Sequence, residues 1–173
     1  MLMIKSSNQL KPIVVIAHNL RSAHNVGSLF RTCEGLGVQE LILSGYTPYP
    51  KMASDNRLPH ISAKLDAQIA KTALDAQDSL SWRHVEHLGK VVNHFKNEGY
   101  QIIGLEQSDK SKDIISFKPT NGIILILGNE VEGLDTESIA ICDVLLEIPM
   151  FGKKESFNVV QAAAMALYAL RFS

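Results

Sequence analysis

The sequence predicts an α/β fold in which a mostly parallel sheet is covered by helices on both faces. Short β-branched runs alternate along the chain with segments of helical periodicity. The runs are continuously apolar, as in strands that are buried on both sides. The 173 residues are a normal length for one domain, and no repeat or low-complexity tract divides them.

Strands are expected where the apolar runs are bounded by turn residues. The most convincing is the NGIILIL run at 121–127. The full set of predicted strands is 12–17, 40–43, 100–105, 121–127 and 144–148.

Helices are expected where apolar residues recur every three or four positions between a capping residue and a glycine. Asn25 is expected to cap a helix over 26–35 that ends at Gly35. Asp135 is expected to cap a short helix to 141, and Ser156 a final helix to 170. Two further helices are predicted at 61–76 and 85–97, and loops at 18–24 and 45–59.

Composition excludes several classes of protein. A net charge of -1 and 46% hydrophobic residues argue against disorder and against coating of nucleic acid by bulk charge. The longest apolar runs are too short to cross a bilayer, and residues 1–11 lack the features of a signal peptide, so we expect a cytoplasmic protein. The spacing of Cys33 and Cys142 excludes a disulfide framework and a zinc ribbon.

The common cofactor and metal motifs are absent. The Gly-x-Gly at 35–37 follows a helix and precedes a strand, which is the reverse of a dinucleotide-binding loop. No phosphate-binding Gly-x-x-x-x-Gly-Lys, nucleophile elbow or His-Glu-x-x-His occurs. The group His84, Glu86, His87 and His94 has no second ligand pair, so we interpret it as solvated surface and expect no metal.

Three polar groups follow predicted strands, where ligands bind in open α/β sheets. The first is the Asn25-to-Arg31 segment NVGSLFR, and the second is the GNEVEGL segment at 128–134. The third is IPMFG at 148–152, followed by SFN at 156–158 and an alanine-rich helix. Each alone is an ordinary turn or helix cap, but their order along the chain is specific.

In this order the three groups resemble the motifs of the SpoU/TrmH branch of the SPOUT methyltransferases, over about residues 12–170. The first matches at Asn25, Gly27 and Arg31, and the second at 127–130 with 133–134. The third matches at 148–150, Gly152, Ser156 and 158–159, with Phe157 where the family usually has leucine. The resemblance implies a trefoil knot formed after about residue 121, and an obligate homodimer.

The resemblance also implies the chemistry. These enzymes methylate the ribose 2′-hydroxyl of tRNA or rRNA with S-adenosylmethionine. The residues in catalytic positions are Asn25, Arg31, Glu130, Ser156 and Asn158. Those expected to hold the cofactor are Leu127, Gly128, Asn129, Ile148, Met150 and Phe157.

A guanidinium does not deprotonate in proteins, so we expect Arg31 to hold a phosphate and stabilise the developing alkoxide. Residues 1–173 are expected to be one methyltransferase domain without an appended RNA-binding domain. A restricted basic surface would then bind the RNA, and the candidates are Lys5, Lys11, Arg21, Lys51 and Arg57.

Two other interpretations stay open at this stage. One is a catalytically silent RNA-binding dimer on the same fold. The other is a small α/β enzyme with an unrelated ligand, in which case the motif match is chance. The presence of Arg31, Glu130, Ser156 and Asn158 together favours the methyltransferase.

Overall fold

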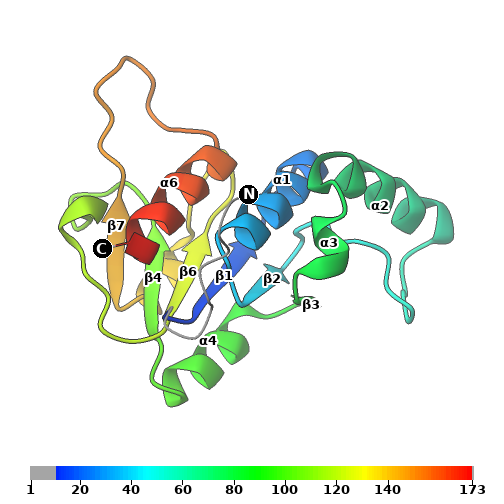
Figure 1. The fold of residues 1–173 in the computed structure, drawn as a ribbon, viewed down its shortest axis with the longest axis horizontal. Helices are drawn as coiled ribbons and strands as arrows, with labels where there is room; N and C mark the ends of the chain where they lie inside the picture. The colour runs from blue at the N-terminus through cyan, green and yellow to red at the C-terminus, as the bar shows by residue number, and fades with distance from the viewer. Residues whose placement is uncertain (1–10, 173) are drawn as a thin grey trace, which may run out of the picture.

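All strands in the described part of the chain, residues 11–172, belong to one parallel sheet in this computed structural model. The seven strands lie in the order β3-β2-β1-β6-β4-β7-β5 (Figure 1). They are β1 (Ile13–His18), β2 (Glu40–Ser44), β3 (Trp82–Val85), β4 (Gln101–Leu105), β5 (Lys112–Asp113), β6 (Ile123–Leu127) and β7 (Val144–Glu147). The predicted parallel sheet is confirmed.

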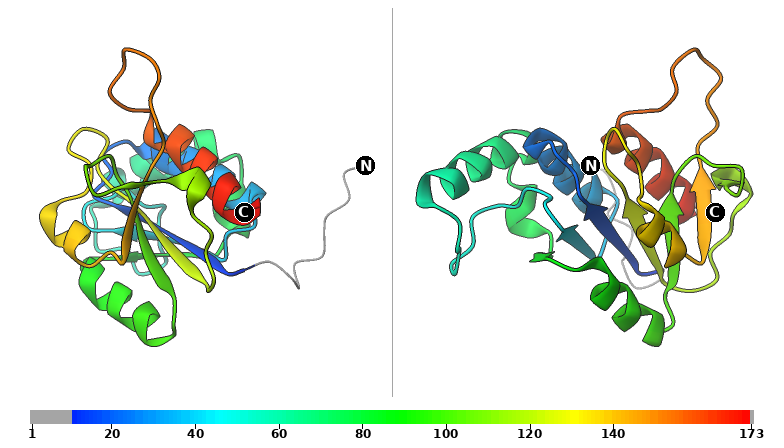
Figure 2. Two further views of the ribbon diagram at one scale, coloured as in Figure 1. Left: turned by 90° about the vertical axis from the view of Figure 1, so that its left-hand side faces the viewer. Right: turned by 180° about the vertical axis from the view of Figure 1, so that it is seen from behind.

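Helices cover both faces of the sheet, as predicted (Figures 1 and 2). One face packs against α1 (Ala23–Gly35), α2 (Pro59–Ala73), α3 (Ala76–Ser79) and α6 (Val159–Phe172). The other packs against α4 (Leu88–Asn97) and α5 (Thr136–Ala140). Alternate residues of β1 and β6 enter the two cores, which explains why the stretches 13–17 and 123–127 are apolar at every position.

Two predicted helix starts are wrong. Helix α1 begins at Ala23, with Ser22 as its N-cap, because the Ser22 hydroxyl accepts from the Asn25 N–H at 3.3 Å. Helix α6 begins at Val159, and the Asn158 side chain, not Ser156, accepts from the Val160 N–H at 2.9 Å. In both places two capping residues stand within three positions, and sequence alone does not choose between them.

The segment 82–97 also differs from the prediction. Its first part is the edge strand β3, and the helix starts only at Leu88. Strand β3 has four residues and includes Arg83 and His84, so it lacks the apolar run that marked the other strands. The predicted helix over 61–76 is divided into α2 and α3 by Leu74 and Asp75, both with positive φ.

Arg171 ties the end of α6 to the end of α1. Its Nε donates to the Leu36 carbonyl at 3.2 Å, and its Nη2 to the Gly37 carbonyl at 2.7 Å. Its Nη1 donates to the Lys11 carbonyl, just before β1, at 2.5 Å. A planar cation thus satisfies carbonyls at a helix C-terminus, where positive charge is favourable.

The trefoil knot that the family resemblance implies stays a prediction.

Between residues 11 and 172, no helix has both the length and the hydropathy to cross a membrane. Cys33 and Cys142 are free, and burial raises the pKa of both thiols, that of Cys142 to about 11.

Gly27 lets α1 approach α2 closely. A Cβ at this position would lie 2.1 Å from the Thr72 hydroxyl and 2.2 Å from the Ile69 carbonyl oxygen. The Thr72 hydroxyl also donates to the His24 carbonyl at 2.8 Å, which fixes the contact from the other side. The glycine of the first motif is therefore explained by helix packing.

We expect Gly27→Ala to lower the free energy of unfolding by about 1–3 kcal/mol, because the added methyl group overpacks this contact. Chemical denaturation of the purified protein measures it. Gly35→Ala, in the same helix, is the matched control, since its Cβ would meet nothing within 4 Å. An equal loss in both variants would contradict the packing explanation.

Candidate functional site

A cavity of about 200 Å³ opens at the carboxyl ends of β4, β6 and β7. Leu105, Leu127 and Glu147, the last residues of these strands, line it together with Val159 and Ala162 of α6. This is the edge of a parallel sheet at which ligands are expected.

The cavity brings together most residues predicted to hold the cofactor. Leu127, Gly128, Asn129, Ile148 and Phe157 line it, and so do Glu130 and Ser156. Met150 does not; it lies half-buried in the segment that follows β7. The second and third motif segments therefore form two sides of one cavity.

A chain of side-chain hydrogen bonds joins all three motifs. The Asn158 amide donates to Asn25 Oδ1 at 3.3 Å, and the Asn25 amide donates to Glu130 Oε1 at 2.9 Å. The Glu130 carboxylate also accepts from two backbone N–H groups at the start of α1, Arg21 at 2.9 Å and Ser22 at 3.1 Å. Asn25, predicted as a helix cap, instead links the other two motifs.

The Glu130 carboxylate is held in its charged form. Burial alone would raise its pKa, but hydrogen bonds from the Arg21 N–H, the Asn25 amide and the Ser22 N–H outweigh burial, so the pKa lies below its ordinary value. An anion at a helix N-terminus is also favoured by the helix dipole. Glu130 therefore acts here as an acceptor that positions α1.

Arg31 takes no part in this series of side-chain hydrogen bonds. It is exposed on α1, six residues beyond Asn25, and no ion pair joins it to another residue of 11–172. The structure thus leaves its guanidinium available to a ligand, but does not bring it into contact with Glu130 or Asn158.

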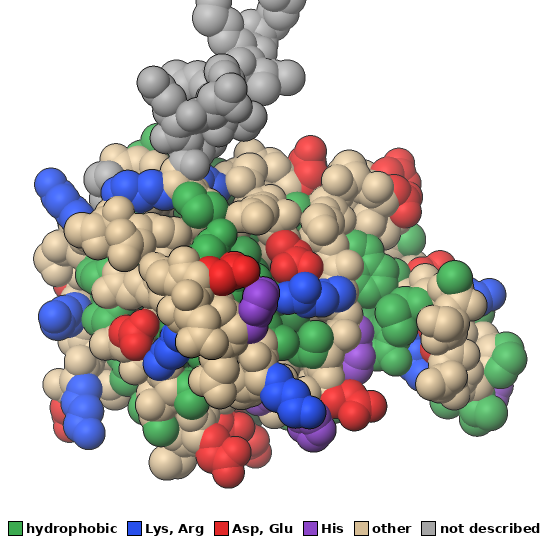
Figure 3. Space-filling model, turned by 90° about the horizontal axis from the view of Figure 1, so that it is seen from below, with side chains coloured by type: hydrophobic (Ala, Val, Ile, Leu, Met, Phe, Trp, Pro, Cys, Tyr) green, Lys and Arg blue, Asp and Glu red, His purple; other side chains and the backbone are tan. Residues whose placement is uncertain are grey.

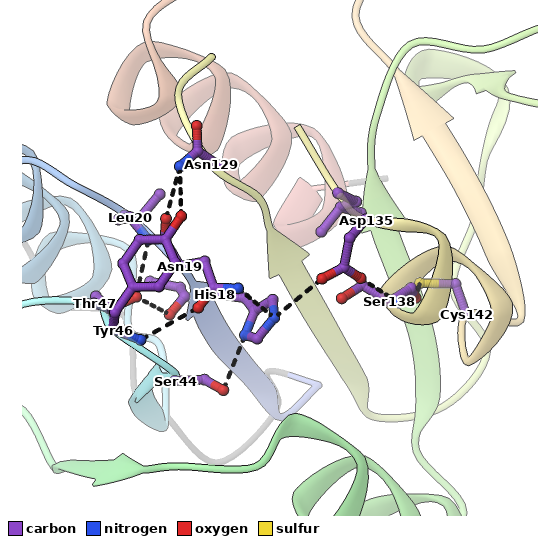
Figure 4. A network of polar contacts seen from close by, with 12 residues as sticks. His18, Asn19, Leu20, Ser44, Tyr46, Thr47, Asn129, Asp135, Ser138 and Cys142 are labelled. Carbon is purple, nitrogen blue, oxygen red and sulfur yellow. Dashed lines mark hydrogen bonds and ion pairs between the residues drawn. The ribbon is translucent and has the colours of Figure 1, made fainter. Parts of the chain in front are cut away.

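Asn129 orders the loops behind the cavity (Figure 4). Its amide donates to the Asn19 carbonyl at 3.0 Å and to the Tyr46 hydroxyl at 2.9 Å, while its Oδ1 accepts from the Val131 N–H at 2.8 Å. Asn129, predicted as a cofactor ligand, lines the cavity, and both polar atoms of its side chain are engaged in hydrogen bonds within the protein.

The tight turn after β6 explains the glycines of the second motif. Gly133 has a φ of +71°, and a Cβ on Gly128 would lie 2.4 Å from the Gly133 carbonyl carbon. Glu106 also holds this turn, since its carboxylate accepts from the Leu134 N–H at 2.6 Å. The loop backbone is therefore fixed around the mouth of the cavity.

Sequence reasoning missed His18, which ends β1 on the opposite face of the sheet. The Tyr46 N–H donates to Asn19 Oδ1 at 3.2 Å, so the Asn19 amide nitrogen faces His18 Nε2 at 3.0 Å. The Nδ1–H of a neutral His18 then donates to the Ser44 hydroxyl at 3.1 Å. Burial lowers the pKa of His18 despite Asp135 at 3.7 Å, which agrees with the neutral form. The sequence signal that could have identified His18 is its position as a polar residue directly after the apolar run 13–17.

The predicted basic residues do not form one surface. Arg57 is engaged within its own loop, with its guanidinium paired to Asp55 and 3.5 Å above the Tyr49 ring. Lys11 precedes β1, at the edge of the sheet opposite the cavity, and its ammonium contacts the Pro119 carbonyl. Arg21 and Lys51 are exposed, and Lys5 lies outside the described residues. On the face in Figure 3, Lys and Arg side chains alternate with acidic ones.

Residues 12–168 match the model of the SpoU rRNA Methylase family. The chain belongs to this family. The match covers the cavity and all three motifs, and it confirms the resemblance drawn from the sequence.

Two relatives are similar over almost the whole chain. One is a 23S rRNA (guanosine-2′-O-)-methyltransferase, RlmB, from Neisseria meningitidis, 31% identical over 92% of this chain. The chain spans 58% of that relative. The other is a tRNA (guanosine(18)-2′-O)-methyltransferase from Aquifex aeolicus, also 31% identical, of which the chain spans 68%.

Solved structures show the same fold. The SpoU methyltransferase AviRb from Streptomyces viridochromogenes, in complex with AdoMet, is 26% identical with a TM-score of 0.75. It matches 93% of this chain and 57% of its own. The TrmH/SpoU tRNA modifying enzyme from A. aeolicus is 27% identical with a TM-score of 0.75, over 92% of this chain and 73% of its own.

The lowered pKa of Glu130 predicts a contribution to stability that depends on pH. Because the folded pKa lies below the unfolded one, the contribution is present above the ordinary glutamate pKa and is lost as pH falls through the folded value. We expect Glu130→Gln to reduce the free energy of unfolding at neutral pH. The difference from wild type should shrink as the solution is acidified below about pH 4.

Denaturant unfolding at a series of pH values measures this difference. Glu137→Gln is the control, since Glu137 is exposed on α5 and no described hydrogen bond or ion pair involves its carboxylate. A difference between wild type and Glu130→Gln that stays constant with pH would argue against the assignment.

Proposed function

We propose that this chain is an S-adenosylmethionine-dependent methyltransferase acting on a ribose 2′-hydroxyl of tRNA or rRNA. The observation that carries the proposal is the single cavity formed by the second and third family motifs, linked by hydrogen bonds to the first. The names of the relatives support the ribose as the site of methylation, and the AviRb complex supports the cofactor.

The residues of the cavity fit S-adenosylmethionine. Leu127, Ile148 and Phe157 provide apolar walls for a flat base, and the backbone of the turn after Gly128 is fixed at the rim. Four glutamates, Glu106, Glu130, Glu132 and Glu147, are among the lining residues, and negative charge there favours a cationic ligand. The bound cofactor would supply an activated methyl group on a sulfonium.

The protein's part in this reaction is to orient and polarise. Arg31 would hold a phosphate oxygen of the RNA and stabilise negative charge as the 2′-hydroxyl loses its proton to a phosphate oxygen or to water. The Asn25–Glu130 contact would fix the start of α1, the helix that carries Arg31. Ser156 and Asn158 would contact the nucleotide from the segment that precedes α6.

Methyl transfer tests the proposal directly. RNA from a strain lacking the gene is incubated with the protein and isotope-labelled S-adenosylmethionine, then digested to nucleosides for mass spectrometry. A labelled 2′-O-methylnucleoside is the expected product. A label on a base would contradict the ribose assignment. Cofactor binding without any transfer would favour the silent RNA-binding dimer.

Arg31→Ala is expected to lower the methylation rate about 100-fold or more while S-adenosylmethionine affinity changes by only a few-fold. Arg31 lies outside the cavity, so its loss leaves the cofactor contacts in place. Single-turnover rates at saturating RNA and titration calorimetry measure the two effects. Near-normal turnover in the variant would overturn the role of Arg31.

The family resemblance also implies a homodimer in which the first and last helices form the interface. Ala163 and Ala166 do not provide that face, because both are buried in the chain's own core. Met165, Tyr168 and Phe172 instead form an exposed stripe at helical spacing, 38%, 62% and 61% accessible. We propose this stripe as the dimer contact.

We expect a dimer that persists at micromolar concentration and that Tyr168→Glu with Phe172→Glu converts to monomers, since two charges would be buried. Analytical ultracentrifugation measures the mass, and circular dichroism checks that the variant is folded. Ile115→Glu is the control, at a residue that is 74% exposed outside α6. A wild-type monomer of 19.1 kDa with full activity would refute the dimer.

The choice between tRNA and rRNA and the cytoplasmic location remain proposals. Methylation of RNA in the cell is consistent with the cytoplasmic location expected from the sequence. Separate assays with tRNA and rRNA fractions decide the substrate.

A further inference from the structure

The segment between β7 and α6, residues 148–158, stands away from the body of the protein in every view (Figures 1 and 2). We call it the β7–α6 loop. Residues 151–158 are all exposed, and Phe151 is 98% accessible. The chain's own core therefore covers almost none of this phenylalanine ring, which marks it as a contact for another molecule.

The charges beside Phe151 indicate what that molecule is. Lys153 and Lys154 follow the ring by two and three residues, both are exposed, and no ion pair joins either to another residue between 11 and 172. An aromatic ring next to lysines suits single-stranded RNA, because bases stack on the ring while ammonium groups bind phosphates. A protein interface would instead have to desolvate both lysines, which are depleted in such contacts.

The two ends of the loop lie at the cavity. Ile148 at one end and Ser156 and Phe157 at the other line the proposed cofactor site. RNA held at the tip of the loop would therefore be anchored beside the reacting nucleotide. None of the basic residues predicted from the sequence occupies this position.

We propose that the β7–α6 loop binds the RNA substrate beside the methylated nucleotide, with Phe151 stacked on an unpaired base and Lys153 and Lys154 on phosphates. The proposal rests on the proposed function and adds to it the residues that bind an unpaired stretch of the substrate. It also predicts that RNA affinity depends on a segment that forms no part of the sheet.

Two sets of variants measure separately how the Phe151 ring and the two lysine charges contribute to RNA affinity. Lys153→Ala with Lys154→Ala should weaken RNA binding and reduce the slope of log affinity against log salt by about 1–2, corresponding to two lost phosphate contacts. Phe151→Ala should weaken binding about tenfold with little change of slope, and Phe151→Tyr should restore it. S-adenosylmethionine affinity should be unchanged in all of them.

The probes are tRNA and rRNA fractions from a strain lacking the gene, titrated at several KCl concentrations. Lys64→Ala with Lys71→Ala is the matched control, because it removes the same charge from exposed positions of α2, at the other end of the molecule (Figure 1). The control should keep the wild-type slope.

The outcomes are distinguishable from failure of the proposed function. If wild type methylates RNA but the loop variants bind it as tightly and with the same slope, the loop proposal is wrong and the function stands. If Phe151→Ala dissociates a dimer in ultracentrifugation, the ring contacts a second copy and the loop proposal is also wrong. If wild type neither binds nor methylates RNA, both proposals fail.

Discussion

The contact between the Glu130 carboxylate and the start of α1 is the interaction on which the candidate site depends. Its partners, Arg21, Ser22 and Asn25, lie more than 100 residues earlier in the chain. A helix N-terminus presents N–H groups without intrahelical partners, and a carboxylate is the strongest acceptor that a side chain offers them. One glutamate thus sets where α1 begins relative to the turn after β6. The amide of Asn158 then joins α6 to the same point through Asn25.

A second layer of polar contacts supports this arrangement from behind. Thr47 is buried, and its hydroxyl donates to the Ala17 carbonyl at 2.9 Å and accepts from the Leu20 N–H at 3.0 Å. Together with Asn129, it fixes the loops after β1, β2 and β6 to one another (Figure 4). Residues that orient a ligand need such support, since an error of an ångström weakens both binding and catalysis.

Most of the fold could be predicted from the sequence because the central strands β1 and β6 contain continuous apolar runs, at 13–17 and 123–127, as expected of a sheet covered on both faces. Strand β3 was not predicted, because it lies at the edge of the sheet, where polar residues such as Arg83 and His84 are tolerated. The cavity could be anticipated from three motifs at strand ends. The hydrogen bond from Asn25 to Glu130 could not be anticipated, because Ser22 and Asn25 are both suitable N-caps for α1. Only the folded backbone decides which of them caps the helix.

Arg171 has a consequence for the order in which the molecule assembles. Its three hydrogen bonds bridge 134 to 160 residues of sequence. The carbonyls at the end of α1 and before β1 therefore receive these donors only after the last helix has been synthesised. Contacts of such long range slow folding, because the chain must close large loops before they form. Helix α1 is therefore made before α6, but the carbonyls at its end receive these donors only once α6 is in place.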